Sequence, residues 1–378
     1  MDFVITKEQK RIQKAAREFL KAKFNSDFVR EMEKDEKGYT RQLWKEMGEL
    51  DWMALIIPEA YDGVGGSLFD LVLLLEEFGR VGVQGPFFST VVLGGYGLAR
   101  YGNEEQQQTY LPKIANGEII ISLALEEVGT TQYNPYLVST AATAGNGNYT
   151  LSGRKLFVSN ANSADMLICA ARTSGEAHAK QGISLFLVDT ALPGMEIEPL
   201  ETIGGDKQFE VVFNDVVIDE NALLGIADNG GEYLDGMLDY AAVCKCAEMI
   251  GGAQRVLEMS AEYAKVRKQF GKAIGSFQAI QHHCANMLIK LEGSRYITYK
   301  AAWLLENDES PQLVLAAAKA WVSDSVKEIA ALGHQVQGGS AFMEEHDMPL
   351  FSRRAAAAAV TFGDAAYHRK KVLDALGL

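Results

Sequence analysis

Four cysteines and six histidines are the side chains in this sequence that most readily bind metals or act as nucleophiles. Cys244 and Cys246 are separated by a single residue, whereas zinc sites need a longer spacer between paired cysteines. No histidine lies near this pair in the sequence. His282 and His283 are adjacent on a predicted helix and therefore point in different directions. We expect reduced, mostly buried thiols and no metal site.

Acidic side chains outnumber basic ones along the chain. Its 36 Lys and Arg residues and 50 Asp and Glu residues give a net charge of −14 over 378 residues. Such a surface repels the phosphates of nucleic acids, and no basic patch of useful size offsets it, so we expect no nucleic-acid partner. No secretion signal and no apolar run long enough for a membrane span is visible. We therefore expect a cytoplasmic location.

The hydrophobic pattern divides the chain into three consecutive domains. Residues 1–118 follow a helical period, and Thr6 is the expected N-cap of the first helix. Residues 119–226 instead form short runs rich in β-branched residues, separated by turns. Residues 227–378 return to the helical period. The predicted fold class is α+β, with an N-terminal α-helical domain, a middle β domain and a C-terminal four-helix bundle.

The same patterns place individual elements within these domains. The predicted strands cover 155–158, 166–170, 183–188 and 210–217. The predicted C-terminal helices cover 233–270, 277–306, 311–332 and 348–376. Ser276 and Ser310 are the expected N-caps of the second and third of these helices, with Pro311 at the first helical position of the third. The Gly251-Gly252 pair is the expected break in the first.

Residues 263–281 carry the most specific motif of the chain. They read Tyr-Ala-Lys-Val-Arg-Lys-Gln-Phe-Gly-Lys-Ala-Ile-Gly-Ser-Phe-Gln-Ala-Ile-Gln and strongly resemble the second signature of the acyl-CoA dehydrogenase family. Further segments resemble the same family in the family's own order: Ile57–Glu59 with Gly63, Gly65 and Gly66; Gly153–Asn160; Phe213–Ile218; Leu223–Gly225; and Gln335–Gly339. The resemblance covers essentially the whole chain.

This resemblance implies a cofactor, a reaction and partners. The cofactor is FAD, held between the β domain and the C-terminal bundle. The assembly is a dimer or a dimer of dimers, in which one subunit completes the FAD site of its neighbour. In the reaction a carboxylate removes the α-proton of an acyl-CoA thioester, flavin takes the β-hydride, and hydrogen bonds polarise the carbonyl. An electron-transfer flavoprotein is the implied electron acceptor.

Two groups of cofactor-binding residues follow from the resemblance. The own-flavin set faces the flavin of the same subunit and comprises Leu125, Glu126, Phe157 and Ser159. The neighbour set faces the adenosine and pyrophosphate of the neighbour's FAD and comprises Arg267, Phe270, Gln278, Gln335, Gly338 and Gly339. The guanidinium of Arg267 suits phosphate oxygens because its donors form a fork. Glycine at 338 and 339 suits close backbone approach because no Cβ intervenes.

The catalytic Glu of the family is missing from both positions where the family carries it. The register counted from Arg353 places Phe362 on the Glu of the family's Tyr-Glu-Gly triplet. Ala241 occupies the other known base position, and Ala242 replaces the Arg that commonly follows it. Neither Phe nor Ala can take a proton, so the catalytic residue cannot be read from these positions.

The first signature of the family also departs from its usual form. Glu126 replaces a hydroxyl that bonds the flavin in the family, and Gln132 and Tyr133 replace a Ser-Asp pair. A carboxylate beside an electron-rich reduced flavin is unfavourable because like charges repel. The own-flavin pocket of this subunit is therefore expected to be damaged, whereas the neighbour set is retained.

Four hypotheses account for this pattern of loss and retention. The first is a heteromeric FAD-dependent acyl-CoA dehydrogenase, a heterotetramer, in which this chain lacks the base and completes the site of a homologous subunit. The second is a self-sufficient homotetrameric enzyme with a base relocated to Glu126 or Asp239, with Glu127 as the weakest candidate. The others are a non-redox scaffold that binds acyl-CoA or a partner, and redox-independent acyl-CoA chemistry. The acyl group itself, whether fatty, alicyclic, aromatic or steroidal, is left open.

Overall fold

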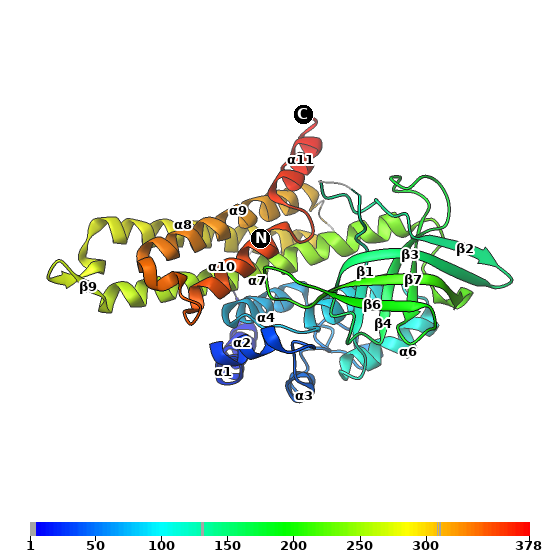
Figure 1. Cartoon of the computed structure of the whole chain (residues 1–378), viewed down its shortest axis with the longest axis horizontal. Helices are drawn as coiled ribbons and strands as arrows, with labels where there is room; N and C mark the ends of the chain where they lie inside the picture. The colour runs from blue at the N-terminus through cyan, green and yellow to red at the C-terminus, as the bar shows by residue number, and fades with distance from the viewer. Residues whose placement is uncertain (1–4, 130–131, 308, 310) are drawn as a thin grey trace.

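The computed structural model describes residues 5–129, 132–307, 309 and 311–378. Figure 1 shows a helical N-terminal part, a β-sheet and a long helical bundle, with the sheet at one end of the bundle. The two helical parts are separated in sequence by the strands, as the sequence predicts. Among the described residues no helix has the length and apolar character needed to cross a membrane.

The N-terminal part consists of helices packed against the bundle. They are α1 (Lys7–Lys23), α2 (Ser26–Lys34), α3 (Arg41–Glu49), a 3₁₀ turn (Glu59–Tyr61), α4 (Leu68–Val81), a π-helix (Phe88–Gly95), α5 (Tyr96–Tyr101) and α6 (Glu104–Ala115). Thr6 caps α1 in a reciprocal capping box with Gln9, as predicted. Helix α4 is the central one, and most of its residues are buried.

The middle part is a mixed sheet in the order β6-β7-β3-β2-β4-β5-β8, with β1 pairing parallel to β4. Its strands are β1 (Ile121–Ala124), β2 (Ala141–Gly145), β3 (Asn148–Ser159), β4 (Met166–Arg172), β5 (Ile183–Asp189), β6 (Met195–Leu200), β7 (Gln208–Asp219) and β8 (Leu223–Leu224), with a 3₁₀ turn at Glu220–Ala222. All four predicted strands lie within β3, β4, β5 and β7 and are confirmed.

The C-terminal part is the helical bundle. Its elements are α7 (Gly230–Val266), a hairpin of β9 (Lys268–Gln269) and β10 (Lys272–Ala273), a 3₁₀ turn (Ile274–Ser276), α8 (Gln278–Glu306), α9 (Gln312–Gln337), a second 3₁₀ turn (Gly338–Phe342), α10 (Asp347–Val360) and α11 (Ala365–Leu376). The hairpin lies at the end of the bundle that is farthest from the sheet (Figure 1).

Helix α7 continues through Gly251-Gly252, so the predicted break is wrong. A Cβ on Gly251 would lie 1.9 Å from the carbonyl oxygen of Glu76 on α4. In return, a Cβ on Gly79 of α4 would lie 1.9 Å from the carbonyl oxygen of Glu248 on α7. These two glycines therefore allow the backbones of α4 and α7 to touch, which is why the helix tolerates them.

Helix ends differ from the prediction in several places: α7 ends at Val266 rather than at residue 270, and α9 continues to Gln337 rather than ending at residue 332. The predicted helix 348–376 is two helices, because Phe362 and Gly363 adopt positive φ values of 58° and 93° between α10 and α11. Ser276 is not the cap of α8: its hydroxyl donates to the carbonyl of Ala273 at 2.7 Å. Pro311 is the N-cap of α9 rather than its first residue, and Ser310 lies outside the described residues.

Candidate functional site

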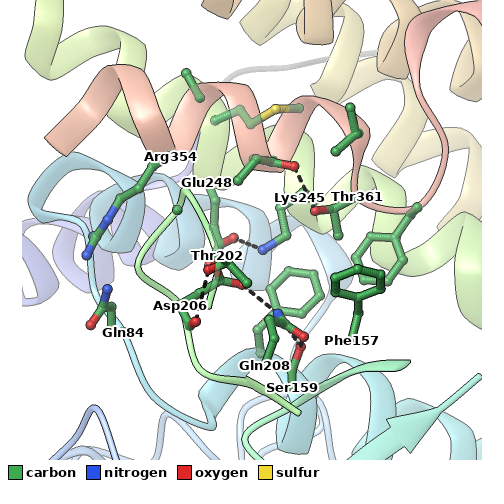
Figure 2. Close-up of a pocket in the computed structure, with 18 of the residues that line it drawn as sticks. Gln84, Phe157, Ser159, Thr202, Asp206, Gln208, Lys245, Glu248, Arg354 and Thr361 are labelled. Atoms are coloured by element: carbon green, nitrogen blue, oxygen red, sulfur yellow. Dashed lines mark hydrogen bonds and ion pairs between the residues drawn. The ribbon is translucent and has the colours of Figure 1, made fainter. Parts of the chain in front are cut away.

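One cavity of about 610 Å³ lies where the sheet, the N-terminal helices and the bundle meet. Figure 2 shows Phe157, Ser159 and Thr361 toward one end of it and Gln84 and Arg354 toward the other. Three of the connecting segments that line it are the 82–85 loop after α4, the 201–208 segment before and at the start of β7, and the break after α10. All four residues of the own-flavin set line this cavity.

A β-bulge presents Phe157 to the cavity. The register between β3 and β7 shifts between Lys155 and Val158, and Phe157 there has a φ of 53°. A bulge turns a side chain away from its regular position on the sheet, and the Phe157 ring is 54% exposed. Nearby, the Ser159 hydroxyl accepts a hydrogen bond from the Gln208 amide at 3.0 Å. An aromatic face and a hydroxyl thus lie together at this end, as the resemblance implies.

Glu127 has a structural role. It forms an ion pair with the buried Lys155 at 2.5 Å and accepts backbone hydrogen bonds from Ser139 and Thr140. Burial alone would raise the pKa of Glu127, but the Lys155 ammonium and the hydrogen bonds together lower it to about 2. Glu127 does not line the cavity. Glu127 is therefore held ionised beside β3 and is unsuited to take a proton.

Glu126 is the carboxyl of the own-flavin set that lines the cavity. Burial raises its pKa above the ordinary value. Tyr133 lines the cavity as well, and its hydroxyl is buried without a hydrogen-bond partner among the described residues. The Tyr133 ring packs edge-on against Tyr367 of α11, with centroids 5.0 Å apart. A carboxyl and a tyrosine therefore stand where the family carries small hydroxyl and acidic side chains.

The two positions where the resemblance implies a base hold no titratable group. Phe362 lines the cavity, and its ring stacks on Phe88 with centroids 5.8 Å apart and planes 17° apart. Ala241 is fully buried within α7 and is not a lining residue. Asp239 lies outside the lining too, and it forms an ion pair with Lys371 at 3.0 Å. Of the two candidates for a relocated base, Glu126 faces the cavity and Asp239 does not.

A buried lysine holds the segment that carries Phe362. The Lys319 ammonium of α9 donates to the carbonyls of Ala359 and Gly363, each at 3.1 Å, and to the Ser323 hydroxyl at 3.0 Å. Carbonyl groups at the end of a helix lack partners within the helix. Lys319 of the neighbouring helix α9 therefore donates the hydrogen bonds that the last carbonyls of α10 lack, and it fixes the break at Phe362.

The neighbour set lies at the opposite end of the bundle. All six of its residues are exposed, and Phe270 in the hairpin region is 91% exposed. A Cβ on Gly338 or Gly339 would meet nothing within 4 Å, so the backbone there is open to a ligand. Gln337 ties this turn to α7 through a hydrogen bond to Ser260 at 3.3 Å. The structure thus separates the neighbour set from the own-flavin set.

Sequence reasoning missed several polar residues that line the cavity, and four of them matter below. They are Gln84, Lys245, Glu248 and Arg354. Lys245 and Glu248 lie one helical turn apart on α7, four and seven residues after Ala241, which is the only signal in the sequence. Among the described residues, no group of Cys, His, Asp and Glu side chains could hold a metal ion. The thiols of Cys169, Cys244 and Cys246 are free and buried, as predicted.

Comparisons with known proteins agree with this architecture. Family models match residues 6–118, 123–216 and 228–377 as the N-terminal, middle and C-terminal domains of acyl-CoA dehydrogenases. A probable acyl-CoA dehydrogenase of Bacillus subtilis is 33% identical over 94% of both chains. A subunit of the caffeyl-CoA reductase–Etf complex of Acetobacterium woodii is 31% identical over 92% of both chains.

A solved structure adds the cofactor. The FAD complex of PigA superposes with a TM-score of 0.93 at 25% identity and covers the whole of both chains. Together with the cavity beside the sheet and the order of the three domains, these matches settle the family. The chain belongs to the acyl-CoA dehydrogenase family of FAD-dependent flavoprotein oxidoreductases.

Proposed function

We propose that this chain is the base-lacking subunit of a heteromeric acyl-CoA dehydrogenase. In this assembly it completes the FAD site of a homologous partner subunit, which supplies the catalytic carboxylate. The observation that carries the proposal is that Phe362 and Ala241 leave both implied base positions without a carboxylate, while the neighbour set is exposed to a partner. The own-flavin set lines the cavity, whereas the neighbour set lies exposed at the far end of the bundle.

The own cavity supports the same proposal. Phe362 occupies the base position and stacks on Phe88, so no carboxylate is present there to remove an α-proton. Glu126 brings a carboxyl to a position where the family carries a hydroxyl, and Tyr133 and Tyr367 add two aromatic rings beside it. Both changes act against binding a flavin in this subunit while leaving the neighbour set intact.

The residues of the neighbour set fit FAD. The turn at Gly338 and Gly339 has open space where a Cβ would stand, and Gly338 has a φ of 65°, which favours glycine. The Arg267 side chain is exposed and offers forked donors for phosphate oxygens. FAD supplies hydride acceptance when it is bound. The residues of this chain would hold its adenosine and pyrophosphate part from across the interface.

The partners follow from the same assignment. The substrate is an acyl-CoA thioester, oxidised between its α and β carbons. The proposed electron acceptor is an electron-transfer flavoprotein, supported by the relative that is a subunit of a caffeyl-CoA reductase–Etf complex. The free buried thiols suit a reducing compartment, so we place the protein in the cytoplasm.

Flavin content tests the proposal. We expect the chain expressed alone to lack the visible absorbance of flavin, and the complex with its homologous partner to carry it. Arg267→Ala should then strip FAD from the complex. Arg11→Ala, which changes an exposed arginine of α1, is the matched control and should leave the spectrum unchanged. Stoichiometric flavin in the lone chain would contradict the proposal.

Glu126 favours one alternative, a self-sufficient enzyme with a relocated base. It lines the cavity, and its raised pKa is what a general base near neutral pH requires. If the lone chain binds flavin and oxidises an acyl-CoA, Glu126→Gln should abolish turnover while retaining flavin. Asp239→Asn would serve as the control, because Asp239 lies outside the cavity lining.

A further inference from the structure

Between the Phe157 end and the Gln84 end, the cavity is lined by charged side chains that the proposed function leaves unused (Figure 2). Lys245 and Glu248 of α7 form an ion pair and are only 17% and 21% exposed. The Lys245 ammonium also lies 3.9 Å from the centroid of the Phe88 ring. The pair is thus largely removed from bulk water and contributes its exposed atoms to the cavity wall.

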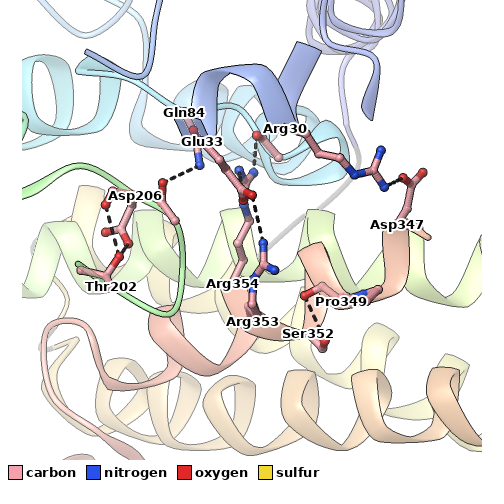
Figure 3. A network of polar contacts seen from close by, with 12 residues as sticks. Arg30, Glu33, Gln84, Thr202, Asp206, Asp347, Pro349, Ser352, Arg353 and Arg354 are labelled. Atoms are coloured by element: carbon pink, nitrogen blue, oxygen red, sulfur yellow. Dashed lines mark hydrogen bonds and ion pairs between the residues drawn. The ribbon is translucent and has the colours of Figure 1, made fainter. Parts of the chain in front are cut away.

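Arg354 reaches the end of the cavity away from Phe157 from α10 (Figure 2). It donates to the carbonyl of Gly82 and to Glu33, the latter at 3.3 Å, and Glu33 also accepts from Arg353 at 2.9 Å (Figure 3). Burial lowers the pKa of Arg354, and Glu33 and Asp206 oppose that effect. Lys245 and Arg354 therefore each have a carboxylate close to them.

Gln84 adds an unsatisfied acceptor. Its amide nitrogen donates to the carbonyl of Gly205 at 3.1 Å, which fixes the orientation of the side chain (Figure 3). Its amide oxygen is buried and has no hydrogen-bond partner among the described residues. A buried polar atom without a partner is unfavourable, because it has lost its hydrogen bond to water without gaining another. A ligand that donates a hydrogen bond at this point would remove that penalty.

These groups distinguish between acyl chains. An alkyl chain would cover Lys245, Glu248 and Arg354 without offering a hydrogen bond, and such uncompensated desolvation is costly. A carboxylate on the acyl chain would meet Lys245 and Arg354, which are already paired with Glu248 and Glu33. It would also be repelled by the Glu248 carboxylate and the Gln84 amide oxygen. A hydroxyl both accepts from a cationic donor and donates to an amide oxygen.

We propose that the cavity of this chain binds acyl thioesters whose acyl chain carries a hydroxyl group toward its distal end. The orientation rests on the proposed function, because it places the thioester beside Phe157 and Phe362 as in a dehydrogenase. The affinity for the acyl group does not depend on flavin. In a heteromeric enzyme this subunit would therefore recognise an oxygenated acyl-CoA without oxidising it.

Calorimetric titration of the full-length chain tests this inference. The probes are CoA, hexanoyl-CoA, 6-hydroxyhexanoyl-CoA and adipoyl-CoA, with the four- and eight-carbon members of each series. We expect the hydroxyacyl thioester to bind at least about tenfold more tightly than the alkanoyl thioester of equal length. An alkanoyl or dicarboxylyl thioester that binds equally or better, or acyl thioesters that bind no better than CoA, would overturn it.

Variants assign the preference to the cavity. The double variant Lys245→Met, Glu248→Leu replaces the ion pair with apolar side chains and should reverse the preference in favour of hexanoyl-CoA. Lys23→Met is the matched control, since Lys23 also combines an ion pair with Glu46 and a cation–π contact, yet lies outside the lining. An unchanged preference in the double variant would refute the assignment.

The complex keeps the test decisive if the lone chain is insoluble. Titration of the complex, with the substitutions made in this chain only, reports the difference that its cavity makes. Calorimetry measures the heat of binding and therefore does not require bound flavin as a reporter. A chain that binds flavin alone but prefers hydroxyacyl thioesters would refute the heteromeric function and retain the ligand assignment, so the two failures are distinguishable.

Discussion

Replacing Lys319 with Met tests how the segment that carries Phe362 is held. The Lys319 ammonium is fully buried, and its donors reach the last carbonyls of α10 and the carbonyl of Gly363. Burial lowers the pKa of Lys319 from 10.5 to about 8 in the folded protein. At roughly 1.4 kcal/mol per tenfold change in proton affinity, this corresponds to about 3 kcal/mol between the two protonation states.

The sign of the pH effect follows from the direction of this shift. Below about pH 8 the folded and the unfolded chain both hold the proton on Lys319, and above about pH 10.5 neither does. Between these values the unfolded chain binds more protons, so this group makes the free energy of unfolding rise with pH. Lys319→Met removes that contribution. The wild type should therefore gain up to about 3 kcal/mol relative to the variant across this window.

The assay is urea unfolding, followed by circular dichroism at a series of pH values from 7 to above 10. Lys300→Met, at an exposed position of α8, is the control, and its profile should run parallel to that of the wild type. Parallel profiles for the wild type and Lys319→Met would refute the reasoning, because they would mean that Lys319 keeps an ordinary proton affinity in the folded protein.

Two further predictions concern the helix crossing and the ion pair in the sheet. Gly251→Ala should lower the melting temperature sharply, because its Cβ would lie 1.9 Å from the Glu76 carbonyl oxygen. Gly252→Ala is the control and should be tolerated, since the nearest atom to its Cβ would be 3.6 Å away. Equal effects of the two substitutions in thermal unfolding would argue against the backbone contact. Lys155→Met should destabilise the protein by about 3–5 kcal/mol, because it leaves the buried Glu127 carboxylate unpaired. The wild type should also lose stability as the pH falls from about 4.5 to about 2, which are the unfolded and folded pKa values of Glu127. Urea unfolding at pH 7 measures the effect of Lys155→Met, and a variant as stable as the wild type would contradict the role of this ion pair.

The strands and most helices could be predicted because local pattern decides them. The apolar runs of β4 and β5 are buried on both faces, and the Thr6 cap of α1 is a local motif. The break after α10 could not be predicted in the same way. The alanine run before it favours helix, and the side chain that fixes the break, Lys319, comes from another helix.

The candidate site was predicted in part for the same reason. Motif spacing led to the own-flavin set, which the structure brings to one cavity. The charged lining formed by Lys245 and Glu248 could not be predicted, because two charged residues at helical spacing are typical of a solvent-exposed helix face. Only the fold shows that this face of α7 borders a cavity. Gly251 stood out in the sequence as well, but a glycine within a helix is compatible both with a helix break and with close contact to another backbone. The sequence alone does not distinguish the two.

The contact between α4 and α7 has a consequence for ligand size. Gly79 touches the backbone of Glu248, and Gly251 touches the backbone of Glu76, so at this crossing the two backbones meet with no side chain between them. The helices can neither approach further nor slide past each other without a backbone clash. The wall that carries Lys245 and Glu248 is thus fixed in position. A longer or bulkier acyl group must be accommodated by rotation of side chains such as Phe88, or by the 201–208 segment across the cavity.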